Sequence, residues 1–161
     1  HSRRRPPRSR RVIERGMLAV TLAALMAAHP SAMVGKTDMR RIALAIDYAA
    51  RRHDIEPRML AAVVLAETGG RRIVRREKRG CSVGVAQIYV PHCVPAQVRR
   101  HLGVWANINR AAEMLAASRK RCESSTGPVC RRGWWALYNA GSTRWAARVG
   151  RIYENLSTTG R

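Results

Sequence analysis

Apolar residues recur at helical spacing along most of the chain after residue 35. The first run covers residues 39–53 and follows Thr37 and Asp38, two residue types that cap helix N-termini. The second run begins at Pro57, which suits a first helical turn, and stops at the glycine pair 69–70. The spacing predicts a helix in each run, and the second is apolar enough to be buried.

Four later segments also have a helical pattern, namely residues 96–101, 104–119, 132–139 and 143–156. Before them, an arginine-rich loop at 71–80 leads to a short segment at 82–89 that we interpret as helical. No stretch alternates between apolar and polar residues as a strand does. We therefore expect one compact, mainly α-helical domain over residues 33–161, with little or no β structure.

The first 32 residues have a different pattern, which predicts a signal peptide. Seven arginines precede an apolar run of twelve residues at 17–28, and small and turn-forming residues follow at 29–32. A membrane-spanning helix needs about 20 residues, so this order favours export with removal of residues 1–32. We expect a periplasmic or cell-envelope location, and a retained N-terminal membrane anchor is the alternative.

Export determines how the four cysteines are interpreted, because an oxidising compartment permits disulfides. They are Cys81, Cys93, Cys122 and Cys130. Of three possible connectivities we favour the local one, Cys81 with Cys93 and Cys122 with Cys130, since each bond closes one irregular loop. The cysteines form no Cys-x-x-Cys pair and fit no zinc-site spacing. Neither a metal nor a cofactor is expected.

The chain is strongly basic, with 31 Lys and Arg against 10 Asp and Glu and a formal net charge of +21. Residues 1–32 hold seven arginines and one glutamate, so the remainder holds 24 basic and 9 acidic residues, or +15. This balance fits an anionic cell-envelope polymer as partner, and a GC-rich coding bias explains it equally well. Export and the lack of a basic-aromatic stacking module argue against nucleic acid.

Glu67 stands out because it ends the very apolar second helix. A carboxyl group held against apolar surface keeps its proton to a higher pH, as a general acid requires. The alternative is a solvated glutamate at a helix end. A helix C-terminus is electrostatically unfavourable for an anion, however, which makes a purely structural role less attractive.

Four short blocks follow one another along the chain: Glu67-Thr68, then residues 84–88 (Gly-Val-Ala-Gln-Ile), 107–109 (Asn-Ile-Asn) and 137–141 (Leu-Tyr-Asn-Ala-Gly). In these blocks and their order, the sequence resembles the lytic transglycosylase catalytic domain, a relative of goose-type lysozyme, over roughly residues 38–156. The departures from the family pattern are Thr68 for Ser, Gly70 for an aromatic residue, Val85-Ala86 for Leu-Met and Trp145 for Tyr.

The resemblance implies a lysozyme-like fold and cleavage of peptidoglycan glycan strands by one glutamate, in a monomeric enzyme. Glu67 first protonates the bond between N-acetylmuramic acid and N-acetylglucosamine. It then takes the proton of the muramic 6-hydroxyl, which closes a 1,6-anhydro ring. Two alternatives stay open. One is a hydrolytic muramidase of the same fold, with water activated by Glu77 or without a second carboxylate. The other is a non-catalytic, cationic envelope-binding protein.

The resemblance also assigns substrate contacts to Thr68, Gln87, Tyr138 and Asn139. Structural roles are the alternative for each residue: Gln87 could brace a loop, Tyr138 could orient Glu67, and Asn139 could end its helix. Three tryptophans are expected in the core rather than as sugar platforms, namely Trp134, Trp135 and Trp145. A framework role is expected for Asn107 and Ile108 of the third block.

Overall fold

Helices build most of the molecule, as the sequence predicts. The structure is a computed structural model that describes residues 19–125, 127–131, 133–140 and 142–158. The helices are α2 (Lys36–Arg52), α3 (Pro57–Glu67), α4 (Pro95–Leu102), α5 (Val104–Glu123), α6 (Pro128–Arg131) and α7 (Thr143–Thr158), with one 3₁₀ helix, η1 (Trp134–Asn139). Three short strands, β1 (Val74–Glu77), β2 (Gly80–Val83) and β3 (Ile88–Pro91), form a small sheet.

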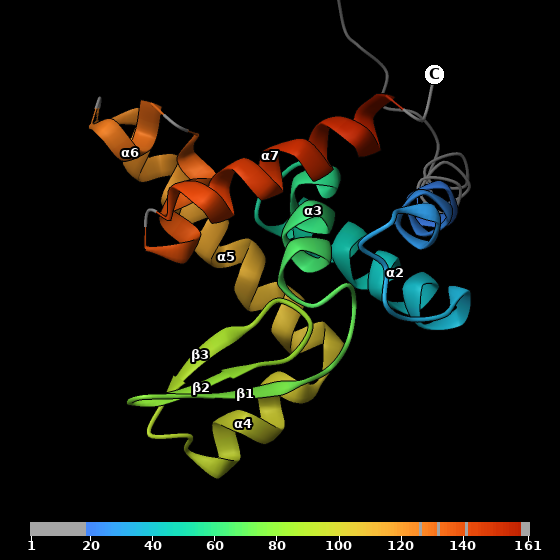
Figure 1. The fold of residues 1–161 in the computed structure, drawn as a ribbon, viewed down its shortest axis with the longest axis horizontal. Helices are drawn as coiled ribbons and strands as arrows, with labels where there is room; N and C mark the ends of the chain where they lie inside the picture. Colours follow the sequence, from blue (N-terminus) through green and yellow to red (C-terminus); the bar gives the residue numbers. More distant parts are fainter. Residues whose placement is uncertain (1–18, 126, 132, 141, 159–161) are drawn as a thin grey trace, which may run out of the picture.

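The helix α3 lies at the centre, with α2, α5 and α7 packed around it (Figure 1). Every residue from Met59 to Ala66 is buried, so the helix has no solvent-exposed face along these two turns. Pro57 occupies its first turn and Gly69 follows its end with a left-handed φ of 63°, which confirms the predicted boundaries.

The start of α2 differs from the expectation that Thr37 and Asp38 cap it. Gly35 holds the N-cap position with an extended backbone, and no side chain caps the helix. Thr37 and Asp38 lie within the first turn instead. An aspartate at this place still interacts favourably with the positive end of the helix dipole, which explains why the local sequence looks like a cap.

The prediction of a short helix at 82–89 is wrong, because these residues form the end of β2, a turn at 84–87 and the start of β3 in an antiparallel sheet of order β1-β2-β3. Ser82 pairs with both Arg75 and Tyr89 in the register. One face of the sheet packs its buried residues Cys81, Val83 and Val90 against α4. Each strand has only four residues, which is too short for a period-2 pattern to be recognised in the sequence.

The helix predicted at 132–139 is also shorter and more irregular than expected. Its described part is the 3₁₀ helix η1, the short helix α6 precedes it without having been predicted, and its first expected residue, 132, lies outside the described residues. Gly133, at the junction, has a φ of 118°, which residues other than glycine avoid. The chain leaves η1 through Ala140 in the left-handed region.

Two disulfides confirm the predicted local pairing. Cys81 is bonded to Cys93 and Cys122 to Cys130, with Cα–Cα separations of 5.1 and 5.3 Å. The first bond ties β2 to the segment that enters α4, and the second ties the end of α5 to α6. Disulfides of this kind persist in oxidising, exported environments.

The expected signal peptide lies partly outside the described residues, of which the first is Ala19. Residues 19–28 form a helix beside α2, and its Leu22 and Met26 are buried in the main core (Figure 1). Beyond this helix, the Met33 amide donates a hydrogen bond of 2.8 Å to the Gly69 carbonyl. Within the part of the chain that the structure describes, no helix combines the length and apolar character needed to cross a membrane.

This packing makes the removal of residues 1–32 testable. A chain that begins at Met33 lacks the buried side chains of Leu22 and Met26. Burial of each side chain of this size contributes about 1.5–3 kcal/mol to the free energy of unfolding. We expect a lower melting temperature for this chain than for one that begins at Met17, measured by circular dichroism. Val20→Ser in the longer chain is the control, because Val20 is exposed. Equal melting temperatures would show that residues 19–28 add nothing to the stable fold.

Candidate active site

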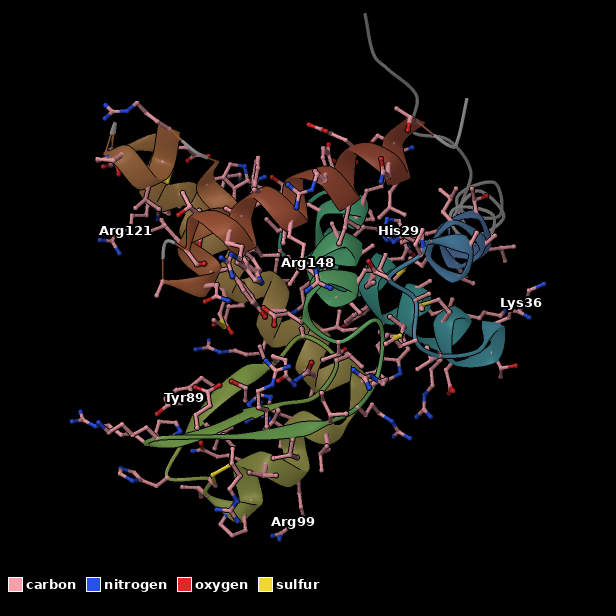
Figure 2. All side chains as sticks on the ribbon, in the orientation of Figure 1. His29, Lys36, Tyr89, Arg99, Arg121 and Arg148 are labelled. Carbon is pink, nitrogen blue, oxygen red and sulfur yellow. A yellow bond between two sulfur atoms is a disulfide. The ribbon has the colours of Figure 1, made fainter. Side chains whose placement is uncertain are left out.

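A cleft of about 310 Å³ opens where the end of α3 meets the sheet, α5 and η1. Its lining comes from segments far apart in the sequence: Glu67, Arg75, Glu77, Ser82, Gln87, Tyr89, Met114, Tyr138, Asn139 and Ala140. Tyr89 projects from β3 on the side of the sheet opposite α4 (Figure 2). The structure thus brings Glu67, Gln87, Tyr138 and Asn139, from three of the four sequence blocks, into one cavity.

The Glu67 carboxyl group is the most perturbed acid in this cleft. Removal from water raises the pKa of Glu67 to about 7, against an ordinary 4.5. A hydrogen bond from Trp145 and the positive charges of Arg75 and Arg148 act in the opposite direction, while the charge of Glu77 adds to the rise in pKa. Burial is the largest of these effects, so the carboxyl group keeps its proton near neutral pH.

Trp145 holds the Glu67 carboxyl group in place, a role that the sequence analysis missed. Its indole Nε1–H donates a hydrogen bond of 2.8 Å to Glu67 Oε1. The indole ring is nearly covered and stacks on the Tyr138 ring, with centroids 5.5 Å apart and planes 9° from parallel. A buried indole N–H usually finds an acceptor, and this was the one signal in the sequence that Trp145 would face a polar group.

Tyr138 does not orient Glu67 through its hydroxyl group. The hydroxyl donates a hydrogen bond of 2.7 Å to the Ala86 carbonyl, which ties η1 to the turn between β2 and β3. Burial and the nearby Glu67 charge raise the pKa of Tyr138 well above its ordinary value. The phenol is therefore a neutral donor at all physiological pH values, and its ring supports Trp145 from beneath.

Thr68 lies behind the cleft rather than on its wall. Its side chain is buried, and its hydroxyl donates 2.8 Å to the Val85 carbonyl while accepting from the Gly70 amide at 3.2 Å. The Thr68 hydroxyl therefore joins the end of α3 to the β2–β3 turn. This geometry fixes the place of Glu67, which is the adjacent residue.

Gln87 braces the β2–β3 turn, which is one of the two roles that the sequence left open, and the substrate contact stays a prediction. Its Nε2 donates to the carbonyls of Gly84, at 2.9 Å, and Ile73, at 3.3 Å, and so braces the turn. Its Oε1 is buried and has no partner among the described residues. A buried acceptor without a partner is costly unless something donates to it, so Oε1 is free to accept a hydrogen bond from a ligand in the cleft.

The turn at residues 84–87 depends on Asn107, whose framework role the structure supports. The fully buried Asn107 amide accepts from Ala86 N and donates to the Val83 carbonyl, both at 2.8 Å. Gly84 packs so tightly here that a Cβ would collide with Asn107 and with the His101 carbonyl, and its φ of 82° excludes most other residues. Asn107 of the third block therefore fixes the turn that the second block forms.

Glu77 adds a second carboxylate to the cleft, where only the hydrolytic alternative of the sequence analysis required it. It lies on β1 two residues from Arg75, so both side chains project from the same face of the sheet. Ser82, on the neighbouring strand, donates a hydrogen bond to Glu77 Oε1. Only the strand pairing, which the sequence does not reveal, brings this carboxylate toward Glu67.

Comparison with known proteins yields no match to a family model, to a curated protein or to a solved structure. Among the described residues, no group of three or more His, Cys, Asp or Glu side chains could hold a metal ion. The cleft presents carboxyl, amide, phenol and guanidinium groups.

The raised pKa of Glu67 predicts a pH-dependent gain in stability for Glu67→Gln. Between pH 4.5 and about 7 the folded state holds a proton that the unfolded state has lost, so the free energy of unfolding falls as pH rises. Above pH 7 the full pKa shift lowers the free energy of unfolding of the wild type by on the order of 3 kcal/mol. We expect the variant to match the wild type at pH 4 and exceed it at pH 8, in urea unfolding curves.

Glu154→Gln is the matched control, because this glutamate is exposed on α7 and its removal changes little at either pH. A Glu67→Gln variant with the same stability difference at pH 4 and pH 8 would contradict the raised pKa.

Proposed function

We propose that this protein is a peptidoglycan lytic transglycosylase with a lysozyme-like fold, acting as a monomer in the periplasm or cell envelope. The observation that carries the proposal is the Glu67 carboxyl group, which burial keeps protonated up to about pH 7 on the wall of an open cleft. The order of the four sequence blocks gives the proposal its substrate class, and the two disulfides agree with an exported protein.

Glu67 suits both steps of the reaction because its pKa, about 7, lies near neutral pH. In the first step its proton passes to the oxygen between N-acetylmuramic acid and N-acetylglucosamine, and the bond from that oxygen to muramic C1 breaks. In the second step the carboxylate takes the proton of the muramic 6-hydroxyl, whose oxygen bonds to C1. The carboxyl group is thereby restored, and no water is consumed.

The other groups of the cleft support this sequence of proton transfers. The Trp145 N–H fixes the carboxyl orientation and stabilises the anion between the two steps. Gln87 Oε1 is a free acceptor for an N-acetyl N–H of the sugar, and the exposed Asn139 amide offers a donor and an acceptor. Arg75 supplies a positive charge for the carboxylates that muramic acid and its peptides carry.

A second candidate function, a hydrolytic muramidase, is favoured by one observation. Glu77 lines the same cleft as Glu67 and interacts with its charge, so a second carboxylate is available to activate water or stabilise an oxocarbenium ion. Ser82 donates a hydrogen bond to this carboxylate, and Arg75 lies two residues before it on β1. The two functions differ in their products, which are anhydro ends or reducing ends.

Digestion of purified peptidoglycan by the wild-type protein should release muropeptides with 1,6-anhydro ends, identified by mass spectrometry. Glu67→Gln should lower the rate by about 10²–10⁴-fold, because the amide neither gives nor takes a proton. The wild-type rate should fall as pH rises through about 7, since the first step needs the protonated acid. Full activity of Glu67→Gln would overturn the assignment, and no release by the wild type would favour a non-catalytic envelope-binding protein.

Glu77→Gln separates the two enzymatic functions. For a transglycosylase we expect anhydro products to persist, with a rate within about tenfold of the wild type, because Glu77 then acts only through its charge. For a hydrolase, reducing ends predominate in the wild type and are lost with Glu77→Gln. Ser82→Ala, which removes only the hydrogen bond to Glu77, serves as the structural control.

A further inference from the structure

Two aromatic rings lie exposed on the joined surfaces of α2 and α5. Tyr48 and Trp105 meet edge to face, with centroids 5.8 Å apart and planes at 74°. Tyr48 is 52% exposed, Trp105 is 46% exposed, and Leu44, one turn before Tyr48, is 44% exposed. Folding gains little by leaving such large apolar side chains in water, and the edge-to-face contact holds both rings in one orientation.

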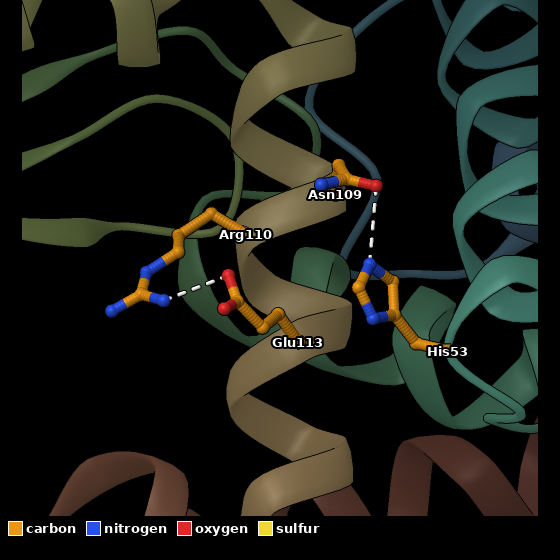
Figure 3. Close-up of polar contacts among 4 residues, drawn as sticks. All are labelled: His53, Asn109, Arg110 and Glu113. Atoms are coloured by element: carbon orange, nitrogen blue, oxygen red, sulfur yellow. Dashed lines mark hydrogen bonds and ion pairs between the residues drawn. The ribbon is translucent and has the colours of Figure 1, made fainter.

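This aromatic pair faces away from the cleft. Met114 lines the cleft, and Trp105 precedes it by nine residues on α5, which at about 100° per residue places the two on opposite sides of the helix. On the same outer side, the Asn109 amide bonds to His53 at the end of α2, at 3.2 Å (Figure 3). Arg110 and Glu113 form their ion pair on the side of α5 away from α2 (Figure 3).

Arginines flank the rings at both ends. Arg41 and Arg52 occupy the same face of α2 as Tyr48, at spacings of seven and four residues, and both are exposed. The Arg52 guanidinium donates to the Tyr48 hydroxyl at 3.5 Å. Neither Arg41 nor Arg52 pairs with a carboxylate among the described residues. We call Arg41, Leu44, Tyr48, Arg52 and Trp105 the α2–α5 surface.

A cavity of about 390 Å³ continues this surface beyond Arg41. Apolar side chains, including Ile42 and Val104, line it together with Arg41, Arg71 and Arg72. Asp38 is the single acidic residue among its described lining residues, so the cavity is positive overall. A cavity with apolar walls and several guanidinium groups suits a ligand that combines methyl or ring surface with carboxylates.

We infer that the α2–α5 surface and this cavity form a second binding site for a carboxylate-bearing glycan strand, separate from the cleft. The C–H faces of sugar rings pack on exposed aromatic rings, and the arginines pair with the carboxylates of the same strand. The inference rests on the proposed function for the identity of the strand, which is the peptidoglycan itself. Binding there keeps the cleft close to further bonds of the wall, because tethering raises their effective concentration.

Other occupants fit the surface less well. A stable protein partner needs about 800 Å² from each side, with a largely apolar centre, whereas here three apolar side chains lie between arginines. Single-stranded nucleic acid would also stack on aromatic rings beside positive charge. The two disulfides are typical of an oxidising, exported environment, and so favour an envelope glycan over nucleic acid.

The test is co-sedimentation with insoluble peptidoglycan, with every variant made on Glu67→Gln so that the wall stays intact. Trp105→Ala should weaken binding about tenfold, which corresponds to ~1.4 kcal/mol. Trp105→Tyr should retain most of the binding, and it also controls for a loss of fold in the alanine variant. Unchanged binding by Trp105→Ala, with an unchanged melting temperature, overturns the inference.

A pair of double variants separates the site from general charge. Arg41→Ser with Arg52→Ser removes two positive charges from the α2–α5 surface, and Arg99→Ser with Arg121→Ser removes two from distant places on α4 and the far end of α5 (Figure 2). The first pair should weaken binding to peptidoglycan severalfold more than the second. Equal losses mean that only the net charge matters and overturn the site.

Two further ligands fix the chemistry of the occupant. Chitin, an N-acetylated glycan without carboxylates, should bind weakly and depend on Trp105 but not on Arg41 and Arg52. Trp105-dependent binding to a single-stranded DNA oligonucleotide that is tighter than binding to peptidoglycan would overturn the glycan assignment.

Cleavage separates this inference from the proposed function. With an intact Glu67, the α2–α5 surface variants should cleave short soluble glycan fragments as fast as the wild type, because such fragments occupy only the cleft. Should the wild type cleave nothing, the proposed function fails, while the sedimentation results still decide the second site.

Discussion

The burial of α3 from Met59 to Ala66 is the constraint on which the rest of the structure depends. A helix with no solvent-exposed face from Met59 to Ala66 must be enclosed by other elements, and α2, α5 and α7 provide this enclosure. Because Glu67 is the next residue after the buried stretch, its carboxyl group is held at the boundary between core and cleft. The same burial that stabilises the helix therefore raises the pKa of the one acid at its end. The stability of the helix and the raised pKa of Glu67 thus have the same physical cause.

The cleft exists because a second, smaller unit is held against this helical core. The sheet packs one face on α4 and turns the other, which carries Arg75 and Glu77, toward Glu67. Three contacts join the β2–β3 turn to the helices: the Thr68 hydroxyl to Val85, the Asn107 amide to Val83 and Ala86, and the Tyr138 hydroxyl to Ala86. Each contact satisfies a backbone group that would otherwise be buried without a partner. Residues of all four sequence blocks thus meet at one turn, although only some of them face the cleft.

Sequence patterns predicted the parts of this molecule that depend on local periodicity. The helices α2, α3, α4, α5 and α7 were predicted within a few residues, as were the disulfide pairs and the position of Glu67 at the end of a buried helix. What failed or was missed depends on contacts between distant residues. Four-residue strands have no readable period, and a 3₁₀ helix resembles an α-helix in sequence. The hydrogen bond from Trp145 to Glu67 spans 78 residues, and Glu77 reaches the cleft only through strand pairing.

The positive charge of the chain has different effects at its two surfaces. At the cleft, the positive charges of Arg75, which lines it, and of Arg148 lower the pKa of Glu67 and so oppose the effect of burial. An anionic group of a bound strand that pairs with Arg75 would offset this charge and also exclude water, and both changes raise the pKa of Glu67 further. The bound substrate would then help to keep the proton on the acid that must donate it. On the outer face, Arg41 and Arg52 lie beside exposed rings on the opposite side from the cleft, and the role we propose for their charge is binding alone. In this proposal the excess of arginine shifts the pKa of an acid on one face and binds a polymer on the other.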